Sequence, residues 1–211
     1  MTSSNIYPDF SSDGKPESAF KSALAFLWEL VKVVVISLAI ILPIRYFLVQ
    51  PFYVKGASME PNFEDHDYLL IDEISFRLRE PQRGEVVVFH YPRDRRQFFI
   101  KRVVGLPGER VLVNGGQVWI GEGDNSPELL AEPYLSPGLV TNGQIDISLG
   151  EDEYYLLGDN RNSSLDSRSF GPVSQDDLVG RIWLRGWPFH RWAWYSSSAT
   201  QALLNSNYAN K

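Results

Sequence analysis

Ser58 lies in a segment of small residues, GASMEP at positions 56–61, and its hydroxyl is a candidate nucleophile. Small neighbours let a substrate backbone come close, and a turn here would present the hydroxyl and nearby amides outward. The chain has no cysteine, so any nucleophile has to be an oxygen or an amine. A serine in an ordinary turn is the alternative, because Glu60 replaces the last glycine of the G-x-S-x-G hydrolase elbow.

Lys101 is the candidate base for such a serine. It lies in FFIKRVV at positions 98–104, where strand alternation places Phe99, Lys101 and Val103 on one face. Burial on an apolar face lowers the pKa of an amine and leaves more of it neutral at pH 7, as a base requires. A lysine that protects a strand edge is the alternative. None of the three histidines lies in a triad or an H-E-x-x-H pattern.

A third polar cluster is GDNRNSSLDSR at positions 158–168. It follows an apolar run, and its Asn, Ser, Asp and Arg side chains can organise a loop through hydrogen bonds and an Asp166–Arg168 ion pair. A solvated loop or a calcium loop is the alternative, but the central glycine and terminal glutamate of an EF-hand are missing. We therefore predict no metal site and no cofactor.

Three blocks in order resemble the bacterial type I signal peptidases, or leader peptidases, of the serine–lysine kind. The blocks follow an apolar N-terminal segment, and the similarity extends over roughly residues 30–190: PFYVKGASMEPNF, FIKRVVGLPGE and GDNRNSSLDSRSFGPV. The resemblance implies that Ser58 attacks the peptide carbonyl to form an acyl-enzyme and that Lys101 is its general base.

The resemblance also implies supporting residues around this pair. Ser164 would hydrogen-bond the lysine amine, and four charged residues would hold the loop beside the catalytic strand: Asp159, Asp166, Arg168 and Arg102.

Three residues would line substrate pockets that admit small side chains: Phe52, Val54 and Phe99. The backbone N–H of Ser58 would stabilise the oxyanion. Some members add a serine hydroxyl two positions earlier, where this chain has Gly56, so the second oxyanion donor stays open.

Short runs rich in β-branched and aromatic residues continue from residue 50 onward. They are separated by turn signals such as Pro107-Gly108 and Asn114-Gly115-Gly116. The predicted fold is mainly β, an antiparallel sandwich or barrel-like domain. The predicted strands are Tyr68–Asp72, Glu85–His90, Phe98–Val104, Arg110–Val113, Gln117–Ile120 and Glu153–Leu157.

An apolar segment, Leu30–Val49, precedes these blocks and has Lys32 and Arg45 near its ends. Its 20 residues are enough for a helix to cross an apolar layer about 30 Å thick. A core helix of a soluble protein and a cleaved signal peptide are the alternatives, but no small-x-small site follows closely. The predicted organisation is a flexible tail (1–29), a transmembrane helix (30–49), a peptidase domain (50–195) and a C-terminal tail (196–211).

The composition agrees with one folded domain and an appendage: 211 residues, 44% hydrophobic, with a net charge of −6. This acidic balance argues against a nucleic-acid partner. The resemblance implies a monomer that works on preproteins at a lipid bilayer and cleaves after a small-x-small site. It also implies a single-pass protein of a bacterial cytoplasmic or internal membrane, with the catalytic domain on the non-cytoplasmic side. The positive charges near the segment favour that orientation by a small margin.

Two other functions remain open at this point. A serine–lysine self-cleaving repressor-like protease would need a DNA-binding domain, and the first 50 residues show no helix-turn-helix pattern. A non-catalytic, membrane-anchored β module that binds a partner is the alternative outside the enzymes. An aromatic cluster near the C-terminus is typical of either a core or a membrane interface: Trp183, Trp187, Phe189, Trp192, Trp194 and Tyr195.

Overall fold

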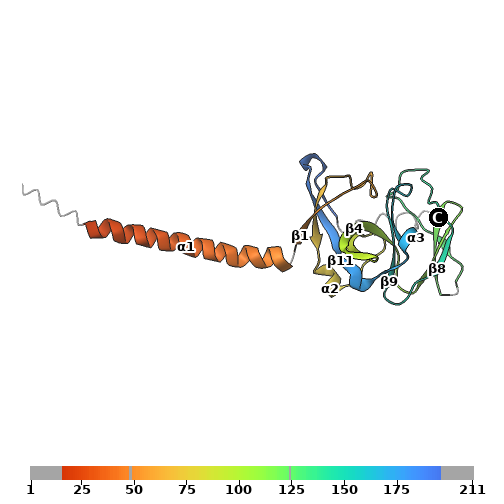
Figure 1. The fold of residues 1–211 in the computed structure, drawn as a ribbon, viewed down its shortest axis with the longest axis horizontal. Coiled ribbons are helices and arrows are strands. Elements are labelled where there is room, and N and C mark those ends of the chain that lie inside the picture. Colours follow the sequence, from red (N-terminus) through yellow and green to blue (C-terminus); the bar gives the residue numbers. More distant parts are fainter. Residues whose placement is uncertain (1–15, 48, 124, 196–211) are drawn as a thin grey trace, which may run out of the picture. The chain divides into compact units, whose positions relative to one another are not determined.

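The computed structural model describes residues 16–47, 49–123 and 125–195 (Figure 1). The chain divides into two compact units, residues 1–44 and residues 45–211. The predicted C-terminal tail at 196–211 and the first 15 residues of the predicted N-terminal tail lie outside the described residues.

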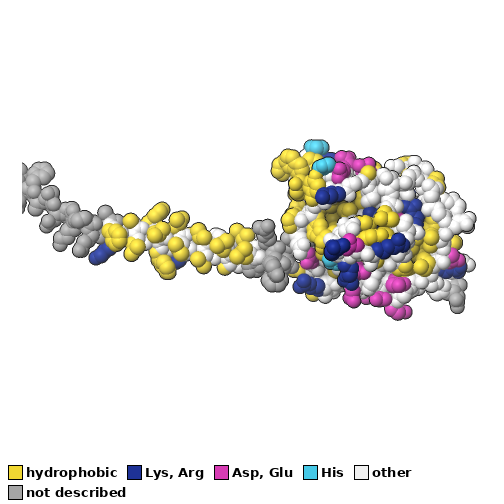
Figure 2. Space-filling view, viewed as in Figure 1, with side chains coloured by type: hydrophobic (Ala, Val, Ile, Leu, Met, Phe, Trp, Pro, Cys, Tyr) yellow, Lys and Arg dark blue, Asp and Glu magenta, His cyan; other side chains and the backbone are white. Residues whose placement is uncertain are grey.

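Helix α1 (Pro16–Phe47) contains a segment that is long and apolar enough to cross a membrane. This segment, Phe20–Leu42, has 23 residues and a mean hydropathy of 2.4, and none of it is buried. At about 1.5 Å per residue it is roughly 35 Å long, more than the hydrocarbon core of a bilayer. Figure 2 shows hydrophobic side chains along this helix.

The apolar segment begins earlier than the predicted span of Leu30–Val49, and α1 includes part of the predicted flexible tail. The charges of Lys21, Glu29 and Lys32 interrupt the apolar run in the sequence. In the helix, however, Lys32 Nζ donates a hydrogen bond of 2.6 Å to Glu29 Oε1 less than one turn away. Because these two charges are paired with each other, the apolar residues before Glu29 belong to the same apolar segment of the helix.

The second unit is built on antiparallel sheets, as predicted. The larger sheet has eight strands in the order β1-β2-β11-β3-β4-β9-β10, with β12 paired to β11. Its strands are β1 (Val49–Tyr53), β2 (Tyr68–Asp72), β3 (Val86–Tyr91), β4 (Asp94–Gly105), β9 (Glu153–Leu157), β10 (Val173–Ser174), β11 (Leu178–Trp187) and β12 (Ala193–Trp194).

The smaller sheet has four strands in the order β7-β6-β5-β8: β7 (Glu128–Leu129), β6 (Gln117–Glu122), β5 (Glu109–Asn114) and β8 (Ile145–Ser148). Gly115 and Gly116 join β5 to β6 with φ of 59° and 81°, the positive values that a tight hairpin turn favours. The two sheets share a core, in which Val104 and Leu157 of the larger sheet pack with Val111 of the smaller.

Short helical turns complete the second unit: α2 (Ser75–Leu78), α3 (Ser167–Phe170), η1 (Gln175–Asp177) and η2 (Phe189–Arg191). All six predicted strands are present, as β2, β3, β4, β5, β6 and β9. The sequence analysis did not identify β11, which lies between β2 and β3 inside the larger sheet. Two register shifts interrupt the pairing of β11 with β2, so its side chains lack the regular alternation that predicts a strand.

Candidate active site

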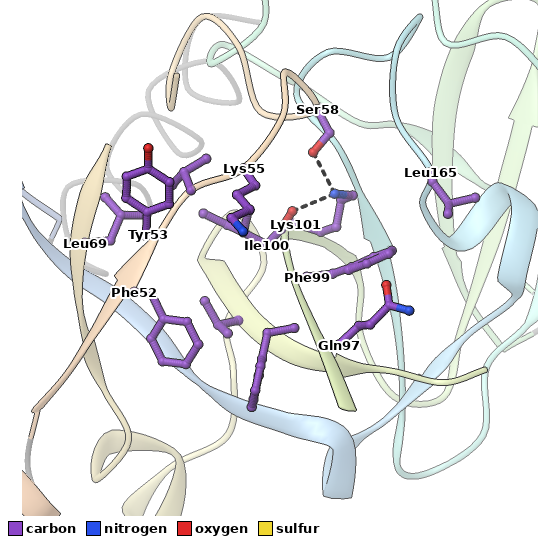
Figure 3. A pocket seen from close by; sticks show the side chains of 13 residues that line it. Phe52, Tyr53, Lys55, Ser58, Leu69, Gln97, Phe99, Ile100, Lys101 and Leu165 are labelled. Atoms are coloured by element: carbon purple, nitrogen blue, oxygen red, sulfur yellow. Dashed lines mark hydrogen bonds between the residues drawn. The ribbon is translucent and has the colours of Figure 1, made fainter. Parts of the chain in front are cut away.

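Ser58 begins a turn that follows β1, and two buried side chains hold this turn in place. Met59 and Phe63 are fully buried in the core beneath the larger sheet, and the Phe63 N–H donates to the Met59 carbonyl at 2.9 Å. The serine therefore lies on a short segment anchored by its neighbours, with its hydroxyl facing a groove (Figure 3).

Lys101 lies on β4, and its amine meets Ser58 across the groove. Lys101 Nζ donates to Ser58 Oγ at 2.8 Å and to the Ile100 carbonyl at 2.7 Å (Figure 3). Because β4 is paired with β3 on one side and β9 on the other, Lys101 does not protect a sheet edge. Its side chain is only 3% exposed.

Burial is the main influence on the Lys101 amine. Desolvation lowers the pKa of Lys101 from 10.5 to about 8, although the carboxylates of Asp166 and Asp159 act in the opposite direction. The ring of Phe99 lies beside the amine, with its centroid 5.5 Å from Nζ. At pH 7 about one molecule in ten therefore has this amine unprotonated and able to accept a proton, far more than for an ordinary lysine.

Asp159, one of these two carboxylates, is paired with Arg102. Arg102 Nε and Nη2 donate to the two Asp159 oxygens at 2.8 and 2.6 Å, and Arg102 Nη1 donates to the Gly84 carbonyl at 2.7 Å. Asn62 donates a further hydrogen bond of 2.8 Å to Asp159, and the Arg102 guanidinium lies 4.1 Å from the Tyr134 ring centroid. Asp159 and Arg102 are both buried, so each charge has its partner inside the protein.

Asp166, the second carboxylate, is paired with Arg168 in the same two-pronged way. Arg168 Nε and Nη2 donate to Asp166 Oδ1 and Oδ2, each at 2.8 Å. The Gly158 N–H also donates to Asp166 Oδ2 at 3.1 Å, which ties the start of the loop to its end. Burial raises the pKa of Asp166, but the hydrogen bonds and charge of Arg168 outweigh it and hold this pKa below its usual value.

Asn160 joins this loop to the turn that carries the serine. Its backbone N–H donates to the Ser58 carbonyl at 3.0 Å, and its side-chain amide donates to the Ala57 carbonyl at 3.0 Å. The sequence analysis did not assign a role to Asn160, although it lies inside the third polar block. Arg161, next in the chain, is buried and pairs with Glu132, which fixes the loop against the segment that follows β7.

Ser164 is near the site, but the hydrogen bond to the lysine amine that the resemblance implies is absent from the structure. Ser164 Oγ is buried and makes no hydrogen bond to Lys101 Nζ, which instead bonds Ser58 Oγ and the Ile100 carbonyl. The hydroxyl packs against Gly158, where an added Cβ would lie 2.1 Å from Ser164 Oγ and 2.6 Å from the Ser58 carbonyl oxygen. Only glycine permits this approach.

The groove beside the serine has a volume of about 610 Å³ and a mostly apolar lining. The three predicted pocket residues, Phe52, Val54 and Phe99, all line it. The described residues of the lining include no carboxylate, and its only charged side chains are two lysines. The remaining lining residues are Tyr53, Lys55, Ser58, Leu69, Val88, Gln97, Phe98, Ile100, Lys101 and Leu165.

The chemistry of these residues is that of a hydroxyl nucleophile with an amine base. Within residues 16–47, 49–123 and 125–195, no group of three or more His, Cys, Asp or Glu side chains could hold a metal ion. The arrangement of Ser58 and Lys101 can perform acyl transfer with protein side chains alone.

Comparison with known families gives one match over most of the chain. Residues 27–187 match the family described as signal peptidase, peptidase S26. This range contains both paired carboxylates, the serine, the lysine and the groove.

Individual relatives agree with the family match. The chain is 39% identical to a probable signal peptidase I-2 of Synechocystis, over 77% of this chain and 74% of the relative. It is 36% identical to a signal peptidase I of Leptolyngbya laminosa, over 84% of this chain and 88% of the relative. A crystal structure of a signal peptidase I from Enterococcus faecalis aligns at 30% identity over 49% of this chain and 97% of that chain, with a TM-score of 0.41.

Proposed function

This chain belongs to the signal peptidase family, peptidase S26, and is a serine peptidase that cleaves signal peptides; we propose that it does so through an acyl-enzyme on Ser58. The observation that carries this proposal is the 2.8 Å hydrogen bond between Lys101 Nζ and Ser58 Oγ. It places a buried amine where the proton of the attacking hydroxyl has to go.

The reaction proceeds in two halves. Neutral Lys101 accepts the Ser58 proton as Oγ attacks the carbonyl carbon, and the resulting ammonium returns the proton to the leaving amine of the mature protein. The amine then accepts a proton from water, which attacks the ester carbonyl and releases the signal peptide. Lys101 returns the proton to Ser58 Oγ, so the enzyme is regenerated.

The developing oxyanion is stabilised by the backbone N–H of Ser58, which donates to no acceptor among the described residues. The Gly56 N–H is not free in the same way, because it donates to Asp65 Oδ1 at 2.9 Å. Ser58 is therefore the oxyanion donor in this proposal.

The groove selects small side chains on the substrate. Phe52, Val54 and Phe99 occupy its lining with large apolar groups, which favours a small-x-small sequence before the scissile bond. The other residues of the site position the pair: Arg102 on β4 pairs with Asp159 and holds the loop against this strand, and Arg168 pairs with Asp166 within the loop. Ser164 is also part of the site, where its side chain packs against Gly158.

The enzyme acts as a monomer anchored in a bacterial cytoplasmic or internal membrane by Phe20–Leu42, with its catalytic unit on the non-cytoplasmic side. Four aromatic side chains support contact of the catalytic unit with lipid, because they are at least half exposed: Trp187, Phe189, Trp192 and Trp194. Trp183 is less exposed and packs against Trp194, and Tyr195 packs on the buried Phe63, so part of the predicted aromatic cluster belongs to the core.

The test is cleavage of a purified preprotein by the full chain in detergent, compared with Ser58→Ala and Lys101→Ala. We expect both variants to lose nearly all activity, and a serine-directed acylating inhibitor to label the parent protein but not Ser58→Ala. Near-normal cleavage by either variant would refute the mechanism. Cleavage of the chain itself without cleavage of the preprotein would favour a self-cleaving protease instead.

A further inference from the structure

Lys55 carries a positive charge on the groove wall that the proposed mechanism does not use. It is one of the two charged residues in the lining, and unlike Lys101 its side chain is exposed. Lys55 makes no hydrogen bond or ion pair with any residue that the structure describes. An unpaired ammonium beside an apolar groove is free to meet a charge that a ligand brings.

The backbone beside Lys55 is held firmly, so its position on the wall is fixed. Val54 is 4% exposed, its N–H donates to the Asp67 carbonyl at 2.9 Å, and its carbonyl accepts from His66 N–H at 3.1 Å. In Figure 3 Lys55 lies between Tyr53 and the Ser58–Lys101 pair. Two residues separate Lys55 from Ser58, so the two Cα atoms are at most about 11 Å apart.

A substrate places its scissile carbonyl at Ser58 Oγ and continues along the groove in both directions. An extended peptide advances about 3.3 Å per residue, so substrate positions within three residues of the scissile bond come within reach of the long Lys55 side chain. The described groove lining has no carboxylate that could compete for this ammonium or attract a basic side chain.

We infer that Lys55 is a specificity residue, which favours an acidic side chain and disfavours a basic one at the positions within three residues of the scissile bond of the preprotein that are not the two small ones. This inference rests on the proposed function and adds a charge preference to it. Exposed ion pairs are weak, so the preference is about two- to fivefold in kcat/KM for each charge. Salt weakens it, because the Debye length falls from about 10 Å at 0.1 M to about 3 Å at 1 M.

The experiment uses a preprotein series in which one position at a time, within three residues of the cleavage site but not at either small position of the small-x-small sequence, is Asn, Asp or Lys. Asn and Asp have nearly the same shape, so the ratio of their kcat/KM values reports charge. The full chain is compared with Lys55→Gln, Lys55→Glu and the control Arg77→Gln, which removes an exposed charge on α2 away from the groove.

We expect an Asp preference of about two- to fivefold at one or more positions in the parent protein, loss of it in Lys55→Gln, and a Lys preference in Lys55→Glu. Arg77→Gln should keep the parent ratios. Equal ratios in the parent and Lys55→Glu, with the Asn series still cleaved, would overturn the inference and leave the proposed function intact. A parent protein that cleaves no member of the series would overturn both.

Discussion

The burial of Lys101 predicts a pH dependence of stability that one substitution removes. Since burial lowers the pKa of Lys101 from 10.5 to about 8, the unfolded chain binds a proton between these pH values that the folded protein does not. Stability therefore rises with pH across this window. At about 1.4 kcal/mol for each pKa unit, Lys101 costs about 3 kcal/mol of stability below pH 8 and nothing above pH 10.5.

Lys101→Met tests this because methionine is apolar, similar in length and does not titrate. The free energy of unfolding of both full chains is measured in detergent by chemical denaturation, with tryptophan fluorescence, from pH 7 to pH 11. Every other titrating group is present in both chains, so its effect cancels in the difference. We expect the difference to change by about 3 kcal/mol in favour of the parent protein as pH rises through the window. A difference that does not vary with pH would refute the burial argument.

The same pKa should govern catalysis. With a pKa of about 8, Lys101 is neutral in about one molecule in ten at pH 7, against about one in 3,000 for the ordinary value of 10.5. The value of kcat/KM should fall about tenfold per pH unit well below pH 8 and level off above pH 9. A value of kcat/KM that keeps rising up to pH 10 would show that the Lys101 amine is solvated in the working enzyme.

Three further substitutions test the loop around the pair. Gly158→Ala should lower activity and destabilise the protein by about 1–3 kcal/mol, because the added Cβ would lie 2.6 Å from the Ser58 carbonyl oxygen. Adding Ser164→Ala should restore neither activity nor stability. Initial rates and thermal unfolding measure both, and full rescue by Ser164→Ala would contradict the prediction. Ser164→Ala alone should lower kcat/KM by no more than about fivefold, since Lys101 already has two acceptors, and a loss as large as that of Ser58→Ala would contradict the observed geometry. Asn160→Ala removes the 3.0 Å hydrogen bond to the Ala57 carbonyl and should lower kcat about fivefold without moving the midpoint of the pH profile of kcat/KM. A moved midpoint would mean that Asn160 acts on the pKa of Lys101 instead.

Local sequence patterns were sufficient for much of the fold. Short runs of β-branched and aromatic residues between clear turn signals identified strands such as β4 and β9. The same approach missed β11, because Arg181 and Arg185 interrupt its apolar residues. In the folded protein these arginines pair with Asp72 and Asp67, which are more than 100 residues away in the chain. A local pattern contains no information about such distant partners.

The residues of the site were likewise predictable only in part. The resemblance to a family identified Ser58 and Lys101, and the structure brings the two together. The bonds of Asn160 to residues 57 and 58 follow from how two distant segments pack, so no local signal could reveal them. The orientation of the Ser164 hydroxyl depends on a single side-chain torsion, which a sequence motif does not determine.

The site is assembled from three segments that lie far apart in the chain: the turn after β1, the middle of β4 and the loop after β9. The serine and the lysine are 43 residues apart, and Arg102 and Asp159 are 57 residues apart. Contacts of this separation form more slowly than local ones, because closing the long loops between the segments costs conformational entropy. A nascent or partly unfolded copy carries both reactive residues, but its lysine is solvated and almost fully protonated at pH 7. Peptidase activity is therefore coupled to completion of the fold.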